Sequence, residues 1–414
     1  MSTGQFSAFD DAAIIEAVRT PWADLNGELA QVSPIDLGIK VGRAVLARAG
    51  CDSAQVDSVL AGSMAQASFD AYMLPRHIGL YSGVPQGVPA LALQRICGTG
   101  LELLRQAATQ LRDGVQLALC VGSESMSRNP IAAYEHRGGF KLGAGVQFKD
   151  FLWEALYDPA PGMDMIATAE QLARDYGLGR EQVDAYALAS HQRALHARDS
   201  GWLAEEIVPL ANETFELAGY QSRGIRLPRR VERVACDSHP RPTSLEALAR
   251  LSAIHAGGVQ TAGNSCAVVD GAAAALVGRA STCPRPALAH LLAASVVGVP
   301  PQVMGIGPAP AIQLLLHRCG LQLDDIGMFE INEAQGGQVL AVARALELDP
   351  SRLNLRGGSI ALGHPLAATG LRLVLTLARQ LRDANQRYGI AAACIGGGQG
   401  MALLIENPGY RPSA

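Results

Sequence analysis

The sequence predicts an α/β protein built from two similar halves, with a different region inserted between them. Three observations support this: an internal repeat, the same order of strands and helices in both copies, and a change of pattern between the copies. At an offset of 270 residues, TGLELLRQAATQLRD (99–113) aligns without gaps to TGLRLVLTLARQLRD (369–383), with nine identities in fifteen positions. Further matches fall in the same register, which indicates an internal duplication.

Each copy is expected to contain the same elements in the same order. A helix ends at a glycine, Gly50 in the first copy and Gly320 in the second. An acidic linker then leads to a strand, a loop, an apolar helix and a buried strand. Strands that alternate with helices predict mostly parallel sheets covered by helices, here as two halves related by a pseudo-two-fold axis. The expected strands are 56–63, 115–122, 326–332 and 390–397, and the expected apolar helices are 100–112 and 370–382.

The region between the copies, 125–266, is expected to be a third unit, an inserted loop domain. Its stretch 165–201 predicts two amphipathic helices broken at Gly177–Gly179, and a basic run, RGIRLPRRVER, follows at 223–233. The expected N-terminal half is 1–124, completed by about 267–287, and the expected C-terminal half is 288–414.

Composition and charge exclude several classes of protein. With 49% hydrophobic residues, 17% charged residues and 45 glycines, the chain is globular rather than disordered. A net charge of −4 does not favour a nucleic-acid partner. The N-terminal segment lacks the basic-then-apolar run of a secretion signal, and the longest apolar stretch (286–299) is too short for membrane insertion. The eight cysteines are single, without a CxxC pair, so we expect reduced thiols, a cytoplasmic protein and no metal site.

The loops before the two apolar helices differ in a chemically useful way. The first loop carries Cys97, and the second carries GHP with His364. If the two helices pack as symmetry mates, their N-termini meet and these two residues become neighbours. A thiol at a helix N-terminus that faces an imidazole has a depressed pKa and is partly thiolate at neutral pH. In the alternative interpretation, Cys97 is a small core residue and His364 is a loop histidine bonded to backbone.

Two further candidates lie at strand ends, where ligand sites of α/β folds gather. Cys394 precedes the glycines 396–398, and Asn332 follows the strand GMFEI. A second cysteine in such a loop could donate and accept a proton. Alternatively, Cys394 is a structural residue like Cys120, which holds the equivalent position in the first copy, and Asn332 is an ordinary turn residue.

The chain resembles the thiolase family over essentially its whole length, which implies a five-layered α-β-α-β-α arrangement of two βαβαβ halves. The matching motifs follow in family order and at proper spacing. They are EAVRTP (16–21), the block around Cys97, GSESMS (122–127), TAE (168–170), TAGN…DGAAA (261–274), MGIGPAPA (304–311), NEA (332–334), GGSIALGHP (357–365) and CIGGGQG (394–400).

The resemblance implies a role for each candidate. Cys97 would be the nucleophile that carries the acyl group as a thioester, and His364 would activate it and help stabilise the substrate oxyanion. Asn332 would hold a water that completes this oxyanion hole. Cys394 would be the acid/base at the α-carbon of acetyl-CoA. Backbone N–H groups of Cys97 and Gly396 would form the second oxyanion hole.

The implied activity is reversible, CoA-dependent thiolytic cleavage of a 3-oxoacyl-CoA to acetyl-CoA and a shortened acyl-CoA. The family further implies CoA and acyl-CoA as substrates without a permanently bound cofactor, and a homodimer or homotetramer, with a β-oxidation multienzyme complex as a further partner. Two alternatives remain: a ketoacyl synthase, which would have histidine in place of Cys394, and a catalytically silent CoA-binding subunit, which would lack a catalytic residue.

Several positions depart from the family pattern and predict an altered acyl pocket. Thr99 and Cys266 stand where serines are usual, Ile166 replaces a glycine, and Gln335 replaces an aromatic residue. The basic run 223–233 could meet CoA phosphates, or it could be a solvated surface or an oligomer loop. The residues expected to contact substrate or CoA are Met165, Ala262, Cys266, Ala334 and Gln335.

Overall fold

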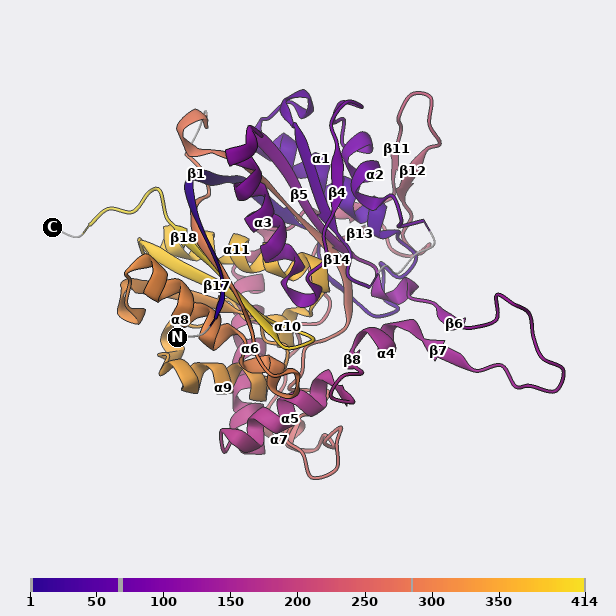
Figure 1. Ribbon diagram of the computed structural model, residues 1–414, viewed down its shortest axis with the longest axis vertical. Coiled ribbons are helices and arrows are strands. Elements are labelled where there is room, and N and C mark those ends of the chain that lie inside the picture. The colour runs from indigo at the N-terminus through magenta and orange to yellow at the C-terminus, as the bar shows by residue number, and fades with distance from the viewer. Residues whose placement is uncertain (1–2, 66–69, 284–285, 413–414) are drawn as a thin grey trace.

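The computed structural model describes residues 3–65, 70–283 and 286–412. Its main feature is one strongly bent, ten-stranded sheet in the order β16-β17-β18-β15-β1-β14-β5-β3-β4, with β2 paired to β14 (Figure 1). The strands are β1 (Gly4–Arg19), β2 (Ala23–Asp24), β3 (Ser58–Gly62), β4 (Ala90–Ala92), β5 (Leu117–Glu124), β14 (Val269–Arg279), β15 (Ala289–Gly298), β16 (Ile326–Ile331), β17 (Tyr388–Ile395) and β18 (Gln399–Glu406).

The longest strand, β1, joins the two halves of the sheet. It pairs antiparallel with β14 on one side and with β15 on the other. Its register shifts between Ala8 and Ala12, and Asp11 has a φ of 60° there, which marks the bend.

The expectation of mostly parallel sheets is wrong. Only the pairs β3–β4, β3–β5 and β16–β17 are parallel among the described pairings of this sheet. The predicted strands of each half do pair in parallel, but the strands that lie outside the repeat motifs pair antiparallel. Strand β18, for example, follows β17 through a tight turn, and a tight turn joins antiparallel neighbours.

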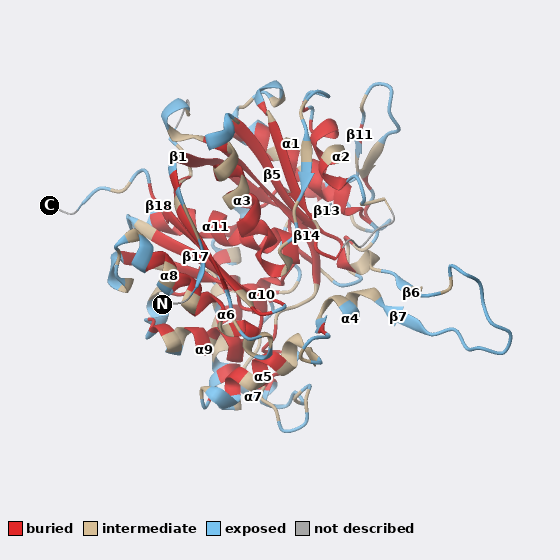
Figure 2. Ribbon diagram, viewed as in Figure 1, coloured by how far each residue is buried: buried red, intermediate tan, exposed pale blue. Residues whose placement is uncertain are grey.

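Helices cover both faces of each half of the sheet, which produces five layers. Helices α3 and α11 lie between the two halves, α1 and α2 cover the outer face of one half, and α8 and α9 cover the outer face of the other (Figure 1). Strand β14 shows why: Ala273 and Ala275 pack toward α3 and α11, whereas Ala272 and Ala274 pack toward α1. Both faces of these strands are therefore buried (Figure 2). The helices are α1 (Pro34–Ala49), α2 (Leu74–Tyr81), α3 (Thr99–Gln110), α8 (Pro308–Cys319), α9 (Gly336–Leu346), α10 (Ser359–Leu362) and α11 (Leu366–Asp383).

Repeat-equivalent residues meet where α3 crosses α11. A Cβ on Gly100 would lie 2.8 Å from the Cα of Gly370, and a Cβ on Gly370 would lie 2.3 Å from the backbone N of Leu101. Gly50 and Gly320 end α1 and α8 in the same left-handed conformation, with φ of 64° and 69°. The predicted duplication is therefore confirmed, and its pseudo-two-fold axis passes between the two central helices.

Replacing Gly370 with alanine is expected to destabilise the protein by about 2 kcal/mol or more, because backbone atoms rather than a movable side chain occupy the space. Alanine in an open helix position would instead stabilise by up to about 1 kcal/mol. Urea unfolding measures the difference. As a control, Gly87→Ala adds a Cβ that meets nothing within 4 Å and should change stability by less than about 0.5 kcal/mol. A Gly370→Ala protein as stable as wild type would contradict the close crossing of the two helices.

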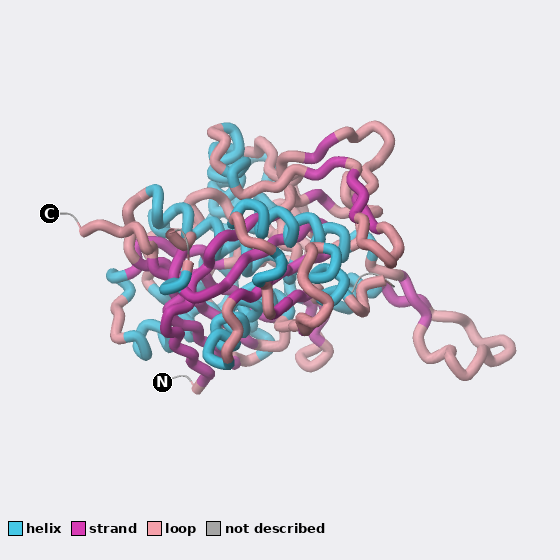
Figure 3. Tube along the Cα trace, turned by 90° about the horizontal axis from the view of Figure 1, so that it is seen from above, coloured by secondary structure: helices cyan, strands magenta, loops and turns pink. Residues whose placement is uncertain are grey.

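The region between the repeats contains the two predicted helices, α5 (Met165–Asp175) and α6 (Arg180–Asp199), separated at residues 177–179. A two-stranded arm, β6 with β7, extends away from the body (Figures 1 and 3). None of the helices in the described ranges is long and apolar enough to cross a membrane. The remaining elements are β6 (Ile131–Ala133), β7 (Phe148–Asp150), α4 (Phe151–Ala155), β8 (Tyr157–Asp158), β9 (Met163–Asp164), β10 (Leu210–Ala211), β11 (Glu213–Phe215), β12 (Arg223–Ile225), β13 (Arg233–Val234) and α7 (Leu245–Ala249).

Candidate active site

Cys97 lies in a tight turn directly before α3. The preceding residue, Ile96, has a φ of 46°, a conformation that a β-branched residue adopts only under constraint. The Thr99 hydroxyl supplies that constraint, since it accepts a hydrogen bond from the Arg95 N–H at 2.9 Å and donates one to the Ile96 carbonyl at 2.7 Å. The threonine that departs from the family pattern thus closes the turn that presents Cys97.

The expected depressed pKa of Cys97 is wrong. Burial raises the pKa of this thiol to about 11, although a hydrogen bond from the Gly396 N–H lowers it in part. The surroundings explain the direction, because Cys97 belongs to a buried apolar cluster with Met64, Met126 and Leu366, whose side chains cannot solvate a thiolate. Cys97 is therefore a neutral thiol in the resting protein.

Alkylation of Cys97 by iodoacetamide should accordingly accelerate about tenfold for each pH unit between pH 7 and 10, because the thiolate is the nucleophile and its pKa is raised to about 11. Mass spectrometry of the Cys97 peptide measures the rate, with the exposed Cys236 as a reference in the same sample. If the rate instead rises with pH and already reaches a plateau by pH 8, the thiol ionises near neutrality and the raised pKa is contradicted.

His364 is buried between two hydrogen-bonding partners. Its Nδ1 lies 2.6 Å from the Thr369 hydroxyl, and its Nε2 lies 3.3 Å from the amide nitrogen of Asn332. The Thr369 hydroxyl donates to the Pro365 carbonyl at 3.1 Å, so it accepts the proton on Nδ1. Burial lowers the pKa of His364 to about 3, and the ring is neutral. Its Nε2 consequently carries a lone pair, which accepts a hydrogen bond from the Asn332 amide in this structure and can act as a base.

Asn332 is held in place by the groups around its amide. The Ser359 hydroxyl donates to its Oδ1 at 2.7 Å, which turns the Nδ2 donor toward His364. Strands β16 and β17 are parallel neighbours, so Asn332 at the end of β16 lies beside the end of β17, where Cys394 is found. Both residues therefore lie at the carboxyl ends of neighbouring parallel strands.

Cys394 is fully buried and packs against Met304 and Ala334. Burial raises its pKa well above the ordinary value, and the proximity of Cys97 and Cys266 raises it further. Three thiols therefore share one site. The chain then turns into β18 through Gly397 and Gly398, whose φ values of 82° and 84° favour glycine.

Two adjoining cavities open onto these groups. The Cys97 cavity, of about 180 Å³, contains Cys97 and Gly396 in its wall. The His364 cavity, of about 200 Å³, contains His364 in its wall. Both are lined by Leu156, Met165 and Leu366, so the two cavities adjoin along these three side chains. No hydrogen bond between Cys97 and His364 is found among the described contacts, and a substrate that enters both cavities would bridge them.

The predicted contact residues divide into three groups. Met165 lines both cavities, and Cys266 and Gln335 line the His364 cavity. Ala334 packs against Cys394. Ala262 is exposed and lines neither cavity.

Sequence reasoning missed several residues of this site. Thr369 could have been found, because it is the repeat mate of Thr99 and uses its hydroxyl in the same way, between a backbone carbonyl and a second group. Leu156, Trp153 and Leu366 carry no motif and were not recognisable as cavity-lining residues.

Glu124 was also missed, although it lies in the GSESMS motif. This fully buried carboxylate accepts hydrogen bonds from the N–H groups of Met64, Ala65 and Ala367 and from the Ser63 hydroxyl. It thereby ties the loop that lines the Cys97 cavity to the first turn of α11. Burial raises its pKa to about 7, and the four donors favour its ionised form.

In this duplicated α/β fold, a thiol and a neutral imidazole lie directly before the two central helices, and an amide and a second thiol lie at the ends of neighbouring strands. This set of groups defines an acyltransferase that works through sulfur. Two family models match the chain: "Thiolase, N-terminal domain" over residues 12–281 and "Thiolase, C-terminal domain" over residues 285–407. The chain belongs to the thiolase family.

Individual relatives agree with this assignment. The mitochondrial 3-ketoacyl-CoA thiolase of Bos taurus is 39% identical over 401 residues, which cover 95% of this chain and 98% of the relative. A probable acetyl-CoA acetyltransferase of Escherichia coli is 38% identical and covers 96% of this chain and 99% of its own length. The crystal structure of the human mitochondrial 3-ketoacyl-CoA thiolase in complex with CoA superposes with a TM-score of 0.89 at 36% identity, and covers 96% of this chain and 98% of that chain.

Proposed function

We propose that the protein cleaves a 3-oxoacyl-CoA with CoA, releasing acetyl-CoA and a shortened acyl-CoA, by way of an acyl group carried on Cys97. The observation that carries the proposal is the placement of Cys97 and His364 in the walls of two adjoining cavities, with the buried Cys394 thiol close enough to Cys97 for that residue to raise the Cys394 pKa. These groups match the requirements of the reaction: a nucleophile, a base for it, and a separate proton donor for the leaving enolate.

In the first half of the proposed reaction, His364 takes the proton of the Cys97 thiol as the sulfur attacks the 3-oxo carbon. Because the Cys97 pKa is raised to about 11 and that of His364 is lowered to about 3, this transfer is uphill and occurs together with the attack. The bond between C2 and C3 then breaks, and Cys394 protonates the enolate of acetyl-CoA at C2. Backbone N–H groups of Cys97 and Gly396 stabilise the enolate oxygen.

In the second half, the Cys394 thiolate takes the proton of an incoming CoA thiol. The CoA sulfur attacks the thioester on Cys97, and the acyl group leaves as the shortened acyl-CoA. The proton on His364 returns to Cys97, which restores the starting state. Asn332, beside Nε2 of His364, positions a water that helps stabilise the thioester oxyanion in both halves.

The test is a thiolysis assay with a panel of 3-oxoacyl-CoAs of increasing chain length, combined with intact mass measurement in the absence of CoA. We expect ping-pong kinetics and a mass increase equal to the shortened acyl group, located on the Cys97 peptide. CoA binding without any cleavage would instead identify a catalytically silent subunit. The panel also determines which acyl-chain length the enzyme prefers. The relatives leave this choice open, because one named for 3-ketoacyl-CoA and one named for acetyl-CoA are almost equally similar to this chain.

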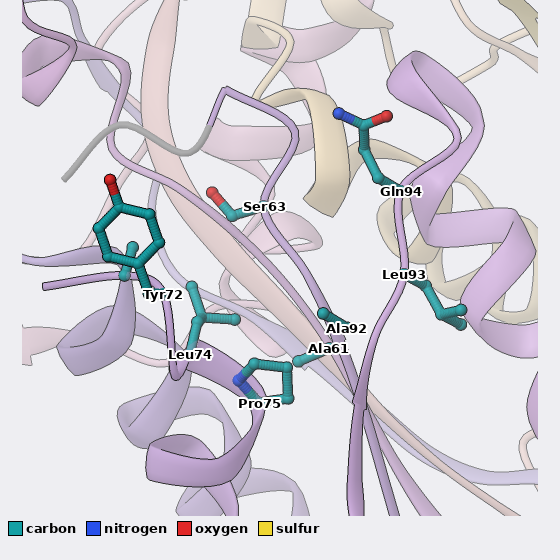
Figure 4. Close-up of a pocket in the computed structure, with 9 residues that line it drawn as sticks. Ala61, Ser63, Tyr72, Leu74, Pro75, Ala92, Leu93 and Gln94 are labelled. Atoms are coloured by element: carbon teal, nitrogen blue, oxygen red, sulfur yellow. The ribbon is translucent and has the colours of Figure 1, made fainter. Parts of the chain in front are cut away.

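The proposal extends to self-association as a homodimer or homotetramer. Strand β4 ends the sheet, and its outer edge has no partner among the described strands. Leu91 on this strand is 47% exposed, and beside it lies a hollow lined by residues such as Tyr72, Leu74 and Leu93 (Figure 4). Unpaired edges of this kind accept a second chain. Light scattering should give a multiple of 43.4 kDa, and Leu91→Lys should shift the protein toward the monomer.

We further propose a role in fatty-acid β-oxidation, with or without a multienzyme partner, in a reducing compartment such as the cytoplasm. The eight cysteines are all free, including the two that the mechanism needs as thiols. Co-purification of the tagged chain from its native source tests for the partner.

A further inference from the structure

Two buried polar side chains in the His364 cavity have an unsatisfied hydrogen-bonding atom. Gln335 is 5% exposed and Ser265 is 8% exposed. The Gln335 Oε1 and the Ser265 Oγ have no hydrogen-bond partner in the part of the chain that the structure describes. Each such atom costs about 1–3 kcal/mol, and native proteins retain few of them. The two atoms therefore indicate a ligand group that completes them.

The backbone holds these two side chains next to each other. Ser265 and Gln335 face each other in an isolated antiparallel bridge. On either side of it, the Cys266 N–H donates to the Ala334 carbonyl at 3.0 Å, and the Gly336 N–H donates to the Asn264 carbonyl at 2.8 Å. The pair is thus set in place before a ligand arrives, which reduces the entropic cost of binding.

The charges around the cavity define what it can bind. Its other lining residues are mainly apolar, and those that the structure describes include no lysine or arginine, whereas Asp164 contributes a carboxylate. Asp164 is itself engaged by the Ala167 N–H at 2.7 Å and by His255 at 3.1 Å. An anionic group would be desolvated here without a cation. A neutral amide or hydroxyl fits, because a glutamine amide and a serine hydroxyl each offer both a donor and an acceptor.

We propose that Gln335 and Ser265 form a polar subsite that binds a neutral amide or hydroxyl group of the thioester substrate beside His364. The inference rests on the proposed function, which brings a 3-oxoacyl-CoA into this cavity. Two parts of such a substrate carry this chemistry: an amide of the pantetheine arm, and a hydroxyl on the acyl chain. In the first case these two residues contribute to CoA affinity, and in the second they determine acyl-chain specificity in a cavity whose other lining residues are mainly apolar.

The test compares Gln335→Met and Ser265→Ala with wild type on two 3-oxoacyl-CoAs of equal length, one with and one without a terminal hydroxyl. Gln313→Met, the same change at an exposed position of α8, is the control. Thermal unfolding without CoA should show an equal or higher Tm for both cavity variants, because they remove unsatisfied groups. For each of the two cavity variants, we expect kcat/KM to fall about tenfold on every substrate whose polar group occupies the subsite. This is the effect of one lost hydrogen bond of about 1.4 kcal/mol.

The outcomes separate the sources of the bound group. A loss confined to the hydroxylated substrate places the acyl chain at the subsite, and an equal loss on both substrates with a raised KM for CoA places the pantetheine arm there. If both variants keep kcat/KM within twofold on both substrates, or if they only lose stability, the proposal is overturned. Calorimetric titration with CoA and with the hydroxyacyl-CoA measures binding without turnover. A wild-type protein that binds these ligands but never cleaves a 3-oxoacyl-CoA would therefore contradict the proposed function and leave the subsite proposal standing.

Discussion

Replacing Cys97 with alanine is expected to lower kcat/KM for thiolysis by about 10⁴-fold or more, because the proposed mechanism carries the acyl group on the Cys97 sulfur. The fold should survive, since the side chain is small and the turn around it is closed by Thr99 rather than by the thiol. Steady-state thiolysis with the best substrate of the panel measures the loss, and circular dichroism confirms that the variant is folded.

The matched control for this variant is Cys319→Ala at the end of α8, a half-buried cysteine outside both cavities. It should cleave at the wild-type rate. If Cys97→Ala retained full thiolysis, the nucleophile would have to be one of the other two thiols of the site, and the proposed mechanism would be wrong.

Replacing Cys394 with alanine is expected to lower kcat by about 10²–10⁴-fold, the usual contribution of a positioned acid or base. Acylation of Cys97 by a simple acyl-CoA needs no proton at carbon and should be less affected than cleavage of the C2–C3 bond. Comparing the two half-reactions by rapid-quench mass spectrometry measures this difference.

Cys120→Ala provides an internal control for Cys394, because Cys120 is its repeat mate, is equally buried and lies on the equivalent strand β5. The Cys120 variant should lose about 1 kcal/mol of stability and keep its kcat. Equal kinetic losses in both variants would mean that Cys394 acts by packing alone.

Much of the fold could be predicted because the duplication is still visible in the sequence. The repeat alignment pairs Gly100 with Gly370, and these residues touch in the structure. The direction of the strands could not be predicted, since β1 and β14 lie outside the aligned motifs and their pairing joins residues more than 250 positions apart. No local pattern encodes such a pairing.

The positions of the candidate residues at helix and strand ends could be predicted from the sequence, and their pKa values could not. Cys97 and His364 lie in the walls of adjoining cavities, Asn332 contacts His364 and Cys394 lies near Cys97, while their catalytic roles stay a prediction. The thiol pKa of Cys97 was predicted in the wrong direction because burial outweighs the helix N-terminus, and the degree of burial follows from Met64, Met126 and Leu366, which come from three distant segments.

The position of β14 has a consequence for the synthesis of the chain. This strand lies between β1 and β5 in the sheet, yet it is translated about 145 residues after β5 ends. Until residue 279 has left the ribosome, β1 and β5 each present an unpaired, apolar edge, and the first half of the sheet cannot close. Nascent chains of intermediate length are therefore the stage at which this protein most needs a chaperone.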